Sequence, residues 1–375
     1  MKNIILFLLL ATFIIQSCSE GDLNTSNNTN NNLSDINGNG DNTDNDNNND
    51  NTPSDGVTWL INKDLVFDGG PGKDGIPALI NPELIGAAAA TYLADDDLVI
   101  GLKIGDDVVA FPHKILDWHE IINIDISNRS IAVTYCPLTG TGVGWNRIIN
   151  NTNTTFGVSG LLYKNNLLPY DRATDSYWSQ LKLECVNGKL IGEMPRTTSF
   201  PEMKWKIWKK LYPQTKVVST NTGHSRNYER YPYGSYKTNN TYFIFPTDAL
   251  HTNIAAKDRV HAIIMDNNAK VFQFRDFRNG SVIRDQFLNR DILVVGNPEF
   301  IVSFELDENT KNLTFTYNYT DSEIILSDEE GNNWNIFGEA LSGPKKGTFL
   351  KLTETSMMAY YFSIDNFYPD VRIHN

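Results

Sequence analysis

After residue 57, apolar and polar positions alternate over short runs, as they do in strands. The runs 98–104, 108–111 and 130–135 are rich in β-branched and aromatic residues, and Asp, Asn and Gly separate them. Such residues favour the pleated surface of a sheet, and the sequence Gly105-Asp106-Asp107 is a natural hairpin connection. This part of the chain is therefore predicted to be rich in β-strands.

Helical periodicity is confined to a few segments. The clearest are residues 113–122 and 202–211, where Trp205 and Trp208 at i, i+3 spacing indicate a stripe that faces the core. The expected fold class is α+β, dominated by strands and with few short helices.

The same pattern occurs twice along the chain. Residues 97–111 resemble 259–272. With an offset of 161, residues 131–137 fall on 292–298, and with an offset of 156, Trp178 falls on Trp334. A chance match would not keep two nearly equal offsets over so long a span. We expect two homologous β-rich repeats, residues 57–240 and 241–375, packed as one unit or as two lobes.

The duplication separates what the fold needs from what one repeat alone keeps. Pro137 and Trp178 recur as Pro298 and Trp334, so they are interpreted as structural. The chemically reactive positions of the first repeat, in contrast, change to other residue types: His113, His119, Glu120 and Cys136 fall on Phe274, Gly280, Ser281 and Asn297. Any site is therefore expected in the first repeat, and the second is expected to be degenerate.

The first 17 residues have the form of a secretion signal. A basic start is followed by an apolar run that is too short to span a bilayer, and the run ends at Ile15-Gln16-Ser17-Cys18. This sequence resembles a lipobox, so we expect lipidation of Cys18 and attachment to a membrane. The alternative is an ordinary signal peptide with a chance cysteine.

Residues 18–56 are almost wholly Asn, Asp, Ser, Thr and Gly, a composition that predicts a disordered tether. Glu20 and Asp22 resemble the signal that carries some lipoproteins to the outer face of the outer membrane, which makes the outer membrane the expected location. Eight acidic residues of the chain, whose net charge is −13, lie in this tether. No basic stripe is interleaved with aromatic residues, so nucleic acid is not an expected partner.

Residues 111–123 hold two histidines and two acids. If the segment is helical, His119 points toward the core, whereas His113, Asp117 and Glu120 share the other face. These residues are candidates for a site. The alternatives are a core histidine satisfied by a backbone carbonyl at His119, and a solvated helix face at His113 and Glu120.

Cys136 follows a strand and precedes Pro137-Leu138-Thr139-Gly140, a sequence typical of a tight turn. Backbone N–H groups of such a turn can lower the pKa of a thiol. A structural disulfide with Cys185, or an inert buried thiol, are the alternatives. The spacing does not support a four-ligand zinc site. The candidate ligands for any other metal are Cys136, His113 and His119.

A second group of polar and aromatic side chains lies in residues 170–180. Asp171, Arg172, Trp178 and Gln180 could line a binding pocket, or they could form a capped turn with a local ion pair.

Several motifs together resemble a bacterial family known as domain of unknown function 3179. They are Asp74-Gly75-Ile76-Pro77-Ala78, residues 115–121, Thr134-Tyr135-Cys136-Pro137-Leu138, residues 156–163, Tyr170-Asp171-Arg172 and Trp178-Ser179-Gln180. In that family the cysteine motif is usually Cys-Pro-Leu-Cys-Gly, and some members place selenocysteine in it, which implies a redox or soft-metal role for Cys136. Thr139 stands where the second cysteine is expected, so this chain cannot run a dithiol cycle within the motif.

Two hypotheses about function follow. In the first, Cys136 is a nucleophile or soft-metal ligand, a histidine stabilises its thiolate, and Glu120 orients the histidine. A soft transition metal is the only cofactor that this hypothesis admits. In the second, the protein is a non-enzymatic cell-surface module that binds a small molecule, a glycan, a peptide or a protein. A hydrolase of unspecified type is a third class, for which no serine elbow or paired-carboxylate signature stands out.

Overall fold

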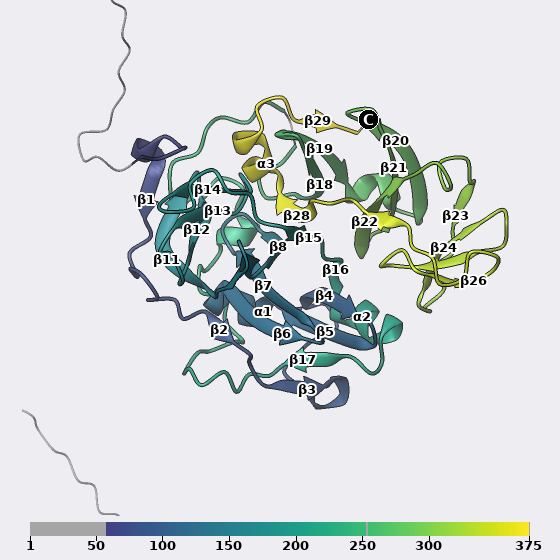
Figure 1. The fold of residues 1–375 in the computed structure, drawn as a ribbon, viewed down its shortest axis with the longest axis horizontal. Helices are drawn as coiled ribbons and strands as arrows, with labels where there is room; N and C mark the ends of the chain where they lie inside the picture. Colours follow the sequence, from purple (N-terminus) through teal and green to yellow (C-terminus); the bar gives the residue numbers. More distant parts are fainter. Residues whose placement is uncertain (1–57, 253, 375) are drawn as a thin grey trace, which may run out of the picture. The chain divides into compact units, whose positions relative to one another are not determined.

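The computed structural model describes residues 58–252 and 254–374, and strands dominate it, as the sequence predicts (Figure 1). The α-helices are short: α1 (His113–His119), α2 (Trp205–Leu211) and α3 (Tyr361–Phe367). Four single 3-10 turns accompany them: η1 (Lys63–Leu65), η2 (Ala87–Ala89), η3 (Tyr236–Thr238) and η4 (Phe274–Phe277). Among the residues described, no helix has the length and hydropathy needed to cross a membrane.

The first half contains three five-stranded sheets. The first has the order β16 (Glu202–Lys204), β4 (Leu98–Ile104), β5 (Asp107–Pro112), β17 (Lys216–Val218) and β3 (Leu84–Gly86). The second has the order β15 (Thr197–Thr198), β8 (Thr141–Asn146), β7 (Arg129–Cys136), β6 (Ile121–Ile126) and β2 (Leu79–Ile80). The third has the order β1 (Val66–Asp68), β11 (Phe156–Tyr163), β12 (Asn166–Asp171), β13 (Tyr177–Ser179) and β14 (Glu184–Asn187), and β9 (Ile148–Ile149) and β10 (Thr152–Asn153) form a separate hairpin.

The second half repeats this topology with three four-stranded sheets. One has the order β28 (Ser356–Tyr360), β18 (Arg259–Met265), β19 (Asn268–Gln273) and β29 (Arg372–Ile373). Another has the order β20 (Ser281–Phe287), β21 (Arg290–Asn297), β22 (Phe300–Leu306) and β27 (Lys351–Leu352). The last has the order β23 (Phe315–Tyr317), β24 (Ile324–Asp328), β25 (Asn333–Asn335) and β26 (Ala340–Ser342).

The correspondence between the halves extends to side chains. The fully buried indole of Trp178 donates to Asp171 over 3.0 Å, and that of Trp334 donates to Asp328 over 2.9 Å. In each half, an edge strand of the first sheet is followed by a helix and then by a short strand that rejoins the same sheet in parallel. This short strand is β17, which pairs with β5, in the first half, and β29, which pairs with β19, in the second. The shared geometry supports a structural role for the retained tryptophans.

The two predicted helices are shorter in the structure than the periodicity suggests. The first ends at His119, because Glu120 takes a left-handed φ of 57° and Ile121 already pairs with Thr134 in the sheet. Residues 202–204 are a strand that pairs with β4, and the helix begins at Trp205. Sheet hydrogen bonds made by residues distant in sequence override local helical periodicity at both places.

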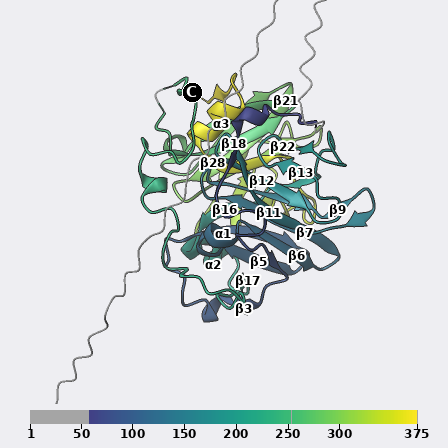
Figure 2. The same cartoon turned by 90° about the vertical axis from the view of Figure 1, so that its left-hand side faces the viewer.

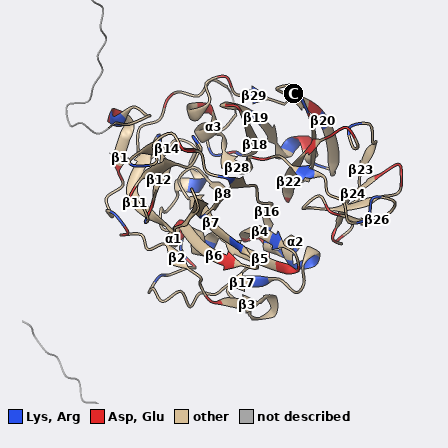
Figure 3. Ribbon diagram, viewed as in Figure 1, with Lys and Arg blue, Asp and Glu red and all other residues tan. Residues whose placement is uncertain are grey.

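The halves pack against each other along a shared core. Trp205 and Trp208 of α2 lie in one apolar cluster with Trp334 of the second half. The helix lies so close to β4 that a Cβ at Gly101 would be 2.0 Å from the Trp208 ring. In Figure 1 the yellow β28 lies beside the teal β8, and Figure 2 shows β28 next to β18, its partner in the sheet. Acidic and basic segments are interspersed over both halves (Figure 3).

Residues 219–258 join β17 to β18, and the turn η3 is the only regular structure among those of them that the structure describes, 219–252 and 254–258. This connecting segment is rich in aromatic residues and packs over α1 and the end of β7, as described below. The boundary at residue 240 drawn from the sequence falls inside it.

Candidate functional site

The Cys136 turn lies where the two halves and the connecting segment meet. Cys136 is the last residue of β7, and it pairs with Thr141, the first residue of β8. The Tyr231 hydroxyl of the connecting segment donates to the Pro137 carbonyl over 3.1 Å, and the Tyr360 N–H of the second half donates to the Thr139 carbonyl over 2.7 Å. Contacts on both sides therefore fix this turn.

The Cys136 thiol is enclosed. Its side chain is 1% exposed and its sulfur lies 3.6 Å from the Asn165 carbonyl oxygen. Burial raises the pKa of Cys136 to about 11, and the nearby carboxyl of Glu120 adds to this effect. These surroundings disfavour the thiolate that a nucleophile or metal ligand requires.

Cys136 and Cys185 are both free, so the structure contains no disulfide between them. The Cys185 thiol is buried and donates to the Asn187 carbonyl over 3.4 Å. Burial raises the pKa of Cys185 to about 12.

We expect both thiols to react slowly in the folded protein. A rise of two pKa units, from 9.0 to about 11, lowers the thiolate fraction of Cys136 about 100-fold near neutral pH, and burial slows access further. Labelling with a chromogenic disulfide reagent, on a form that begins at residue 57, measures the rate. A Cys185→Ser variant isolates Cys136, and labelling in denaturant gives the reference. Rapid labelling of the folded variant below the pH of an ordinary thiol would restore the redox hypothesis.

Two acidic side chains near the C-terminal end of α1 are buried although they are ionisable. Asp117 is 8% exposed and Glu120 is 7% exposed. Burial raises the pKa of each to about 7. The Asp117 carboxyl raises the pKa of Glu120 further, whereas Lys237 and Arg259 partly offset the rise in the pKa of Asp117. The solvated helix face that the sequence allowed for His113 and Glu120 is therefore not formed, because His113 is buried as well.

Glu120 is also held in an unfavourable backbone conformation. Its φ of 57° lies in the left-handed region, which costs a residue other than Gly on the order of 1–3 kcal/mol and often marks functional sites. Its N–H donates to the Leu116 carbonyl over 2.8 Å, and its carbonyl accepts from the Tyr135 N–H over 2.7 Å. The Tyr233 hydroxyl donates to its carboxylate over 3.2 Å.

These carboxyl groups line a cavity of about 400 Å³. Most of its wall is apolar and comes from β11, β12, the Cys136 turn and the connecting segment; the apolar lining includes Leu138, Val158, Leu162, Leu167, Ile244 and Phe245. Polar groups of the wall are Asp117, Glu120, Tyr233 and Arg226. An apolar pocket with a few convergent polar groups is the usual form of a small-molecule site.

The two histidines lie in separate environments. His119 is fully buried, and its Nδ1 and Nε2 lie 2.7 Å from the Pro77 carbonyl and from the Tyr228 hydroxyl, respectively. Burial lowers the pKa of His119 to about 4. His113 Nε2 lies 3.2 Å from Glu202, and burial lowers its pKa as well. Within the described residues, neither ring makes a hydrogen bond or ring contact with Cys136, and the Glu120 carboxyl accepts from Tyr233 rather than from a histidine.

The polar residues proposed to line a groove are largely inaccessible. Asp171, Trp178 and Gln180 are fully buried. Asp171 accepts hydrogen bonds from Thr174 and from Trp178, which is the capped turn that the sequence also allowed. The same tryptophan–aspartate pair recurs in the second half, where Trp334 donates to Asp328. These contacts are structural.

Gln180 and Arg172 stabilise other parts of the first half. The amide of Gln180 donates to Thr134 over 2.9 Å and accepts from Thr141 over 2.7 Å. Arg172 donates to Asp74 over 2.6 Å and to the Phe156 carbonyl over 3.0 Å, so it holds the segment before β2 against β11.

Metal ligands do not gather in this region. Among residues 58–252 and 254–374, no group of three or more His, Cys, Asp or Glu side chains has the arrangement of a metal site. Cys18, the candidate for lipidation, and the signal and tether sequences lie outside the described residues.

Sequence reasoning found Glu120 but missed the residues that complete the cavity. Tyr233, Arg226 and Phe245 come from the connecting segment, more than a hundred residues along the chain from α1. The density of aromatic residues in that segment was the available signal. It indicated packing against an apolar surface, but not which surface.

Fold and cavity together define an internally duplicated, strand-dominated α+β protein with a buried acidic pair in a mainly apolar pocket. The model of a family described as "protein of unknown function (DUF3179)" matches residues 73–371, and the chain belongs to this family. No curated protein and no solved structure matches the chain significantly.

Proposed function

We propose that this protein is an exported, lipid-anchored binding protein. Its ligand is a small, mainly apolar molecule with a cationic or hydrogen-bond-donating group, held in the cavity beside α1. The observation that carries the proposal is that two buried carboxyl groups, Asp117 and Glu120, line an otherwise apolar cavity of about 400 Å³.

The geometry favours binding over thiol chemistry. A volume of about 400 Å³ falls within the range of small-molecule sites, roughly 300–1,000 Å³. Buried carboxyl groups cost free energy unless they are paired, so a ligand with a complementary donor gains from meeting them. Cys136, in contrast, is enclosed and its pKa is raised, so it contributes packing to the apolar core.

The anchoring part of the proposal rests on the sequence around Cys18 and on the tether after it. Acyl chains on this cysteine would hold the folded region near a membrane surface, and the tether would let it reach ligands there. A Cys18→Ser variant that stayed in the membrane fraction would contradict this anchoring.

The binding site can be tested with three probes of one shape: benzylamine, benzyl alcohol and benzoate. We expect calorimetric titration to rank them in that order, because the acidic pair attracts a cation and repels an anion. Glu120→Gln should weaken the binding of benzylamine roughly tenfold or more, because a charge-assisted hydrogen bond is lost. It should weaken the binding of benzyl alcohol less.

Glu83→Gln is the matched control, because Glu83 is exposed and outside the cavity. This variant should bind like the wild type. Equal binding of the three probes, or a Glu120→Gln variant that keeps the full preference for benzylamine, would contradict the proposed site.

A further inference from the structure

A second cavity, of about 300 Å³, lies on another side of Asp117. Its wall combines all three parts of the folded chain: Asp117 and Tyr135 from the first half, Lys237 and Lys257 from the connecting segment, and Arg259 and Tyr360 from the second half. The residues that the sequence suggested as a site all lie in the first half, so this cavity was not foreseen.

The acidic residues at the rim of this cavity already have cationic partners. Asp97 lies 3.0 Å from Lys114, and Asp96 lies 3.1 Å from Lys206. Glu202 pairs with Arg259 behind the wall. The charged groups of this cavity that have no partner of opposite charge are therefore mainly cationic.

Two lysines carry that positive charge. Lys257 is only 7% exposed; its ammonium donates to the carbonyls of Tyr236 and Tyr242, each over 3.1 Å, and lies 3.1 Å from the centre of the Tyr236 ring. Lys237 lies 4.5 Å from the centre of the Tyr231 ring. No carboxylate within ion-pair distance of either lysine occurs in the part of the chain that the structure describes. Burial lowers the pKa of Lys257 to about 8, so it remains mostly charged at neutral pH.

Two phenol groups face the same space without partners. Tyr135 is 2% exposed and Tyr360 is 5% exposed. Neither hydroxyl makes a hydrogen bond to any residue within 58–252 or 254–374, and neither is among the fully enclosed polar atoms that lack a partner, so both are open to the cavity. Two free hydroxyl donors beside two lysines form a set that suits an anionic oxygen group.

The remaining ionisable groups of the wall do not cancel this charge. His113 packs against the Tyr135 ring at 4.4 Å, and burial lowers its pKa, which disfavours its charged form. Burial raises the pKa of Asp117 to about 7, so near neutral pH it can ionise toward a cation in the first cavity, or stay protonated and donate a hydrogen bond to an anion in the second. Arg259 is neutralised by Glu202.

We propose that this second cavity binds the oxyanion group of a small molecule, a carboxylate or a phosphate, through Lys237, Lys257 and the hydroxyls of Tyr135 and Tyr360. The two cavities share Asp117, but Tyr135, Tyr360, Lys237 and Lys257 line only the second among the described residues, so variants at these four positions test the two proposals separately. The proposed anion site also gives a role to the second half, which supplies Tyr360 and positions it through β28.

The test is calorimetric titration of the protein with inorganic phosphate and with acetate near neutral pH, at ionic strength held constant with chloride. We expect saturable binding of one equivalent. Binding of phosphate alone identifies a phosphate site, and binding of acetate identifies a carboxylate site. Tyr135→Phe and Tyr360→Phe remove only a hydroxyl that has no partner, so both should fold, and each should weaken binding roughly tenfold.

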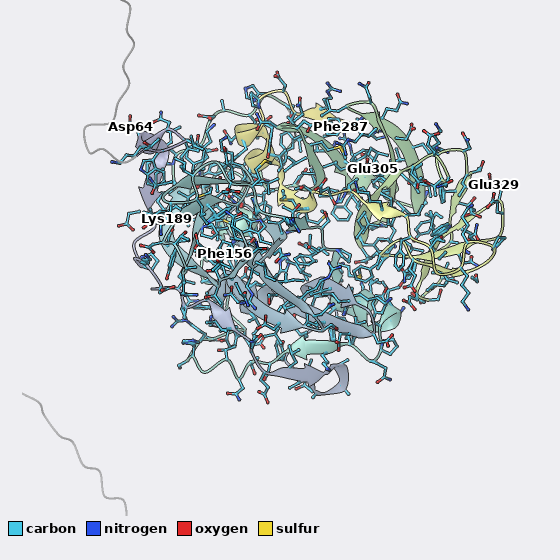
Figure 4. All side chains as sticks on the ribbon, in the orientation of Figure 1. Asp64, Phe156, Lys189, Phe287, Glu305 and Glu329 are labelled. Carbon is cyan, nitrogen blue, oxygen red and sulfur yellow. The ribbon has the colours of Figure 1, made fainter. Side chains whose placement is uncertain are left out.

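Lys237→Met should weaken binding by at least as much, because Lys237 supplies a full charge. Lys189→Met is the matched control: Lys189 is exposed, labelled in Figure 4, and lies in the turn after β14, away from the cavity. Benzylamine binding should be unchanged in Tyr135→Phe, so failure of one cavity does not imply failure of the other. No saturable binding of either anion, or binding that the Tyr135→Phe, Tyr360→Phe and Lys237→Met variants retain in full, would overturn the proposal.

Discussion

Glu202→Gln is expected to lower the free energy of unfolding by about 3–5 kcal/mol, the usual effect of removing one partner of a buried ion pair. Glu202 is 5% exposed and lies between His113 of the first half and Arg259 of the second. Burial opposes its ionisation, but Arg259 and His113 outweigh that effect and lower the pKa of Glu202. Without the carboxylate, Arg259, whose side chain is 20% exposed, is left mostly enclosed and without its partner, and the halves lose a polar contact.

Denaturant unfolding measures this change, and its pH dependence has a defined sign. Because the folded-state pKa of Glu202 lies below its ordinary value of 4.5, its contribution is present above pH 4.5 and is lost as the pH falls. Wild type and variant should therefore converge in acid. A double change, Glu202→Met with Arg259→Met, should recover part of the loss, since no buried charge is left unpaired.

Glu308→Gln is the matched control for this prediction, because the Glu308 side chain is 85% exposed and forms an ion pair with the nearby Lys311. It should not change the unfolding midpoint measurably. An unchanged midpoint for Glu202→Gln would mean that the His113–Glu202–Arg259 contact does not hold the halves together.

Glu120→Gln is expected to stabilise the protein above pH 7, by roughly 3 kcal/mol. Burial raises the pKa of Glu120 from 4.5 to about 7, and each unit corresponds to about 1.4 kcal/mol. The ionised carboxylate is disfavoured in the folded state, so the wild type loses stability as the pH rises from 4.5 through 7. A neutral glutamine avoids this loss and can still accept the hydrogen bond from Tyr233.

Unfolding curves across pH test this expectation. Wild type and Glu120→Gln should be equally stable below pH 4.5 and should diverge steadily up to about pH 7. Glu83→Gln should follow the wild type throughout, because Glu83 is exposed. Curves for Glu120→Gln that run parallel to the wild type would show that Glu120 is solvated. A side chain that destabilises its own fold is kept for a reason other than stability, which agrees with a binding role.

Much of the fold could be predicted from local patterns. The strand at 98–104 has the bounds that its alternation and its Gly105 turn indicate, and the runs 108–111 and 130–135 lie inside β5 and β7. Strand periodicity and turn chemistry are properties of neighbouring residues, so a linear sequence records them directly. The helix ends were predicted less well, because hydrogen bonds to distant strands determine the backbone conformation next to Glu120 and at residues 202–204.

The site was accessible to sequence reasoning only in part. Residue types marked Cys136, His119 and Glu120 as unusual, and comparison of the halves showed that the second lacks them. The expected partnership among them was not found, because side-chain direction depends on packing. His119 turns to Pro77 and Tyr228, whereas Glu120 turns to Tyr233.

The sequence by itself thus determined the strand-rich class, the duplication and the family, since each depends on residue order alone. Only the tertiary structure decided which groups are buried. Asp117 and Glu120 would lie on a solvated face of an isolated helix, but the connecting segment covers them and gives the cavity its apolar wall. Packing of elements far apart in the chain excludes solvent from these two carboxyl groups and so sets their pKa values. The same packing places Tyr360 and Lys257 in the wall of one cavity with Tyr135.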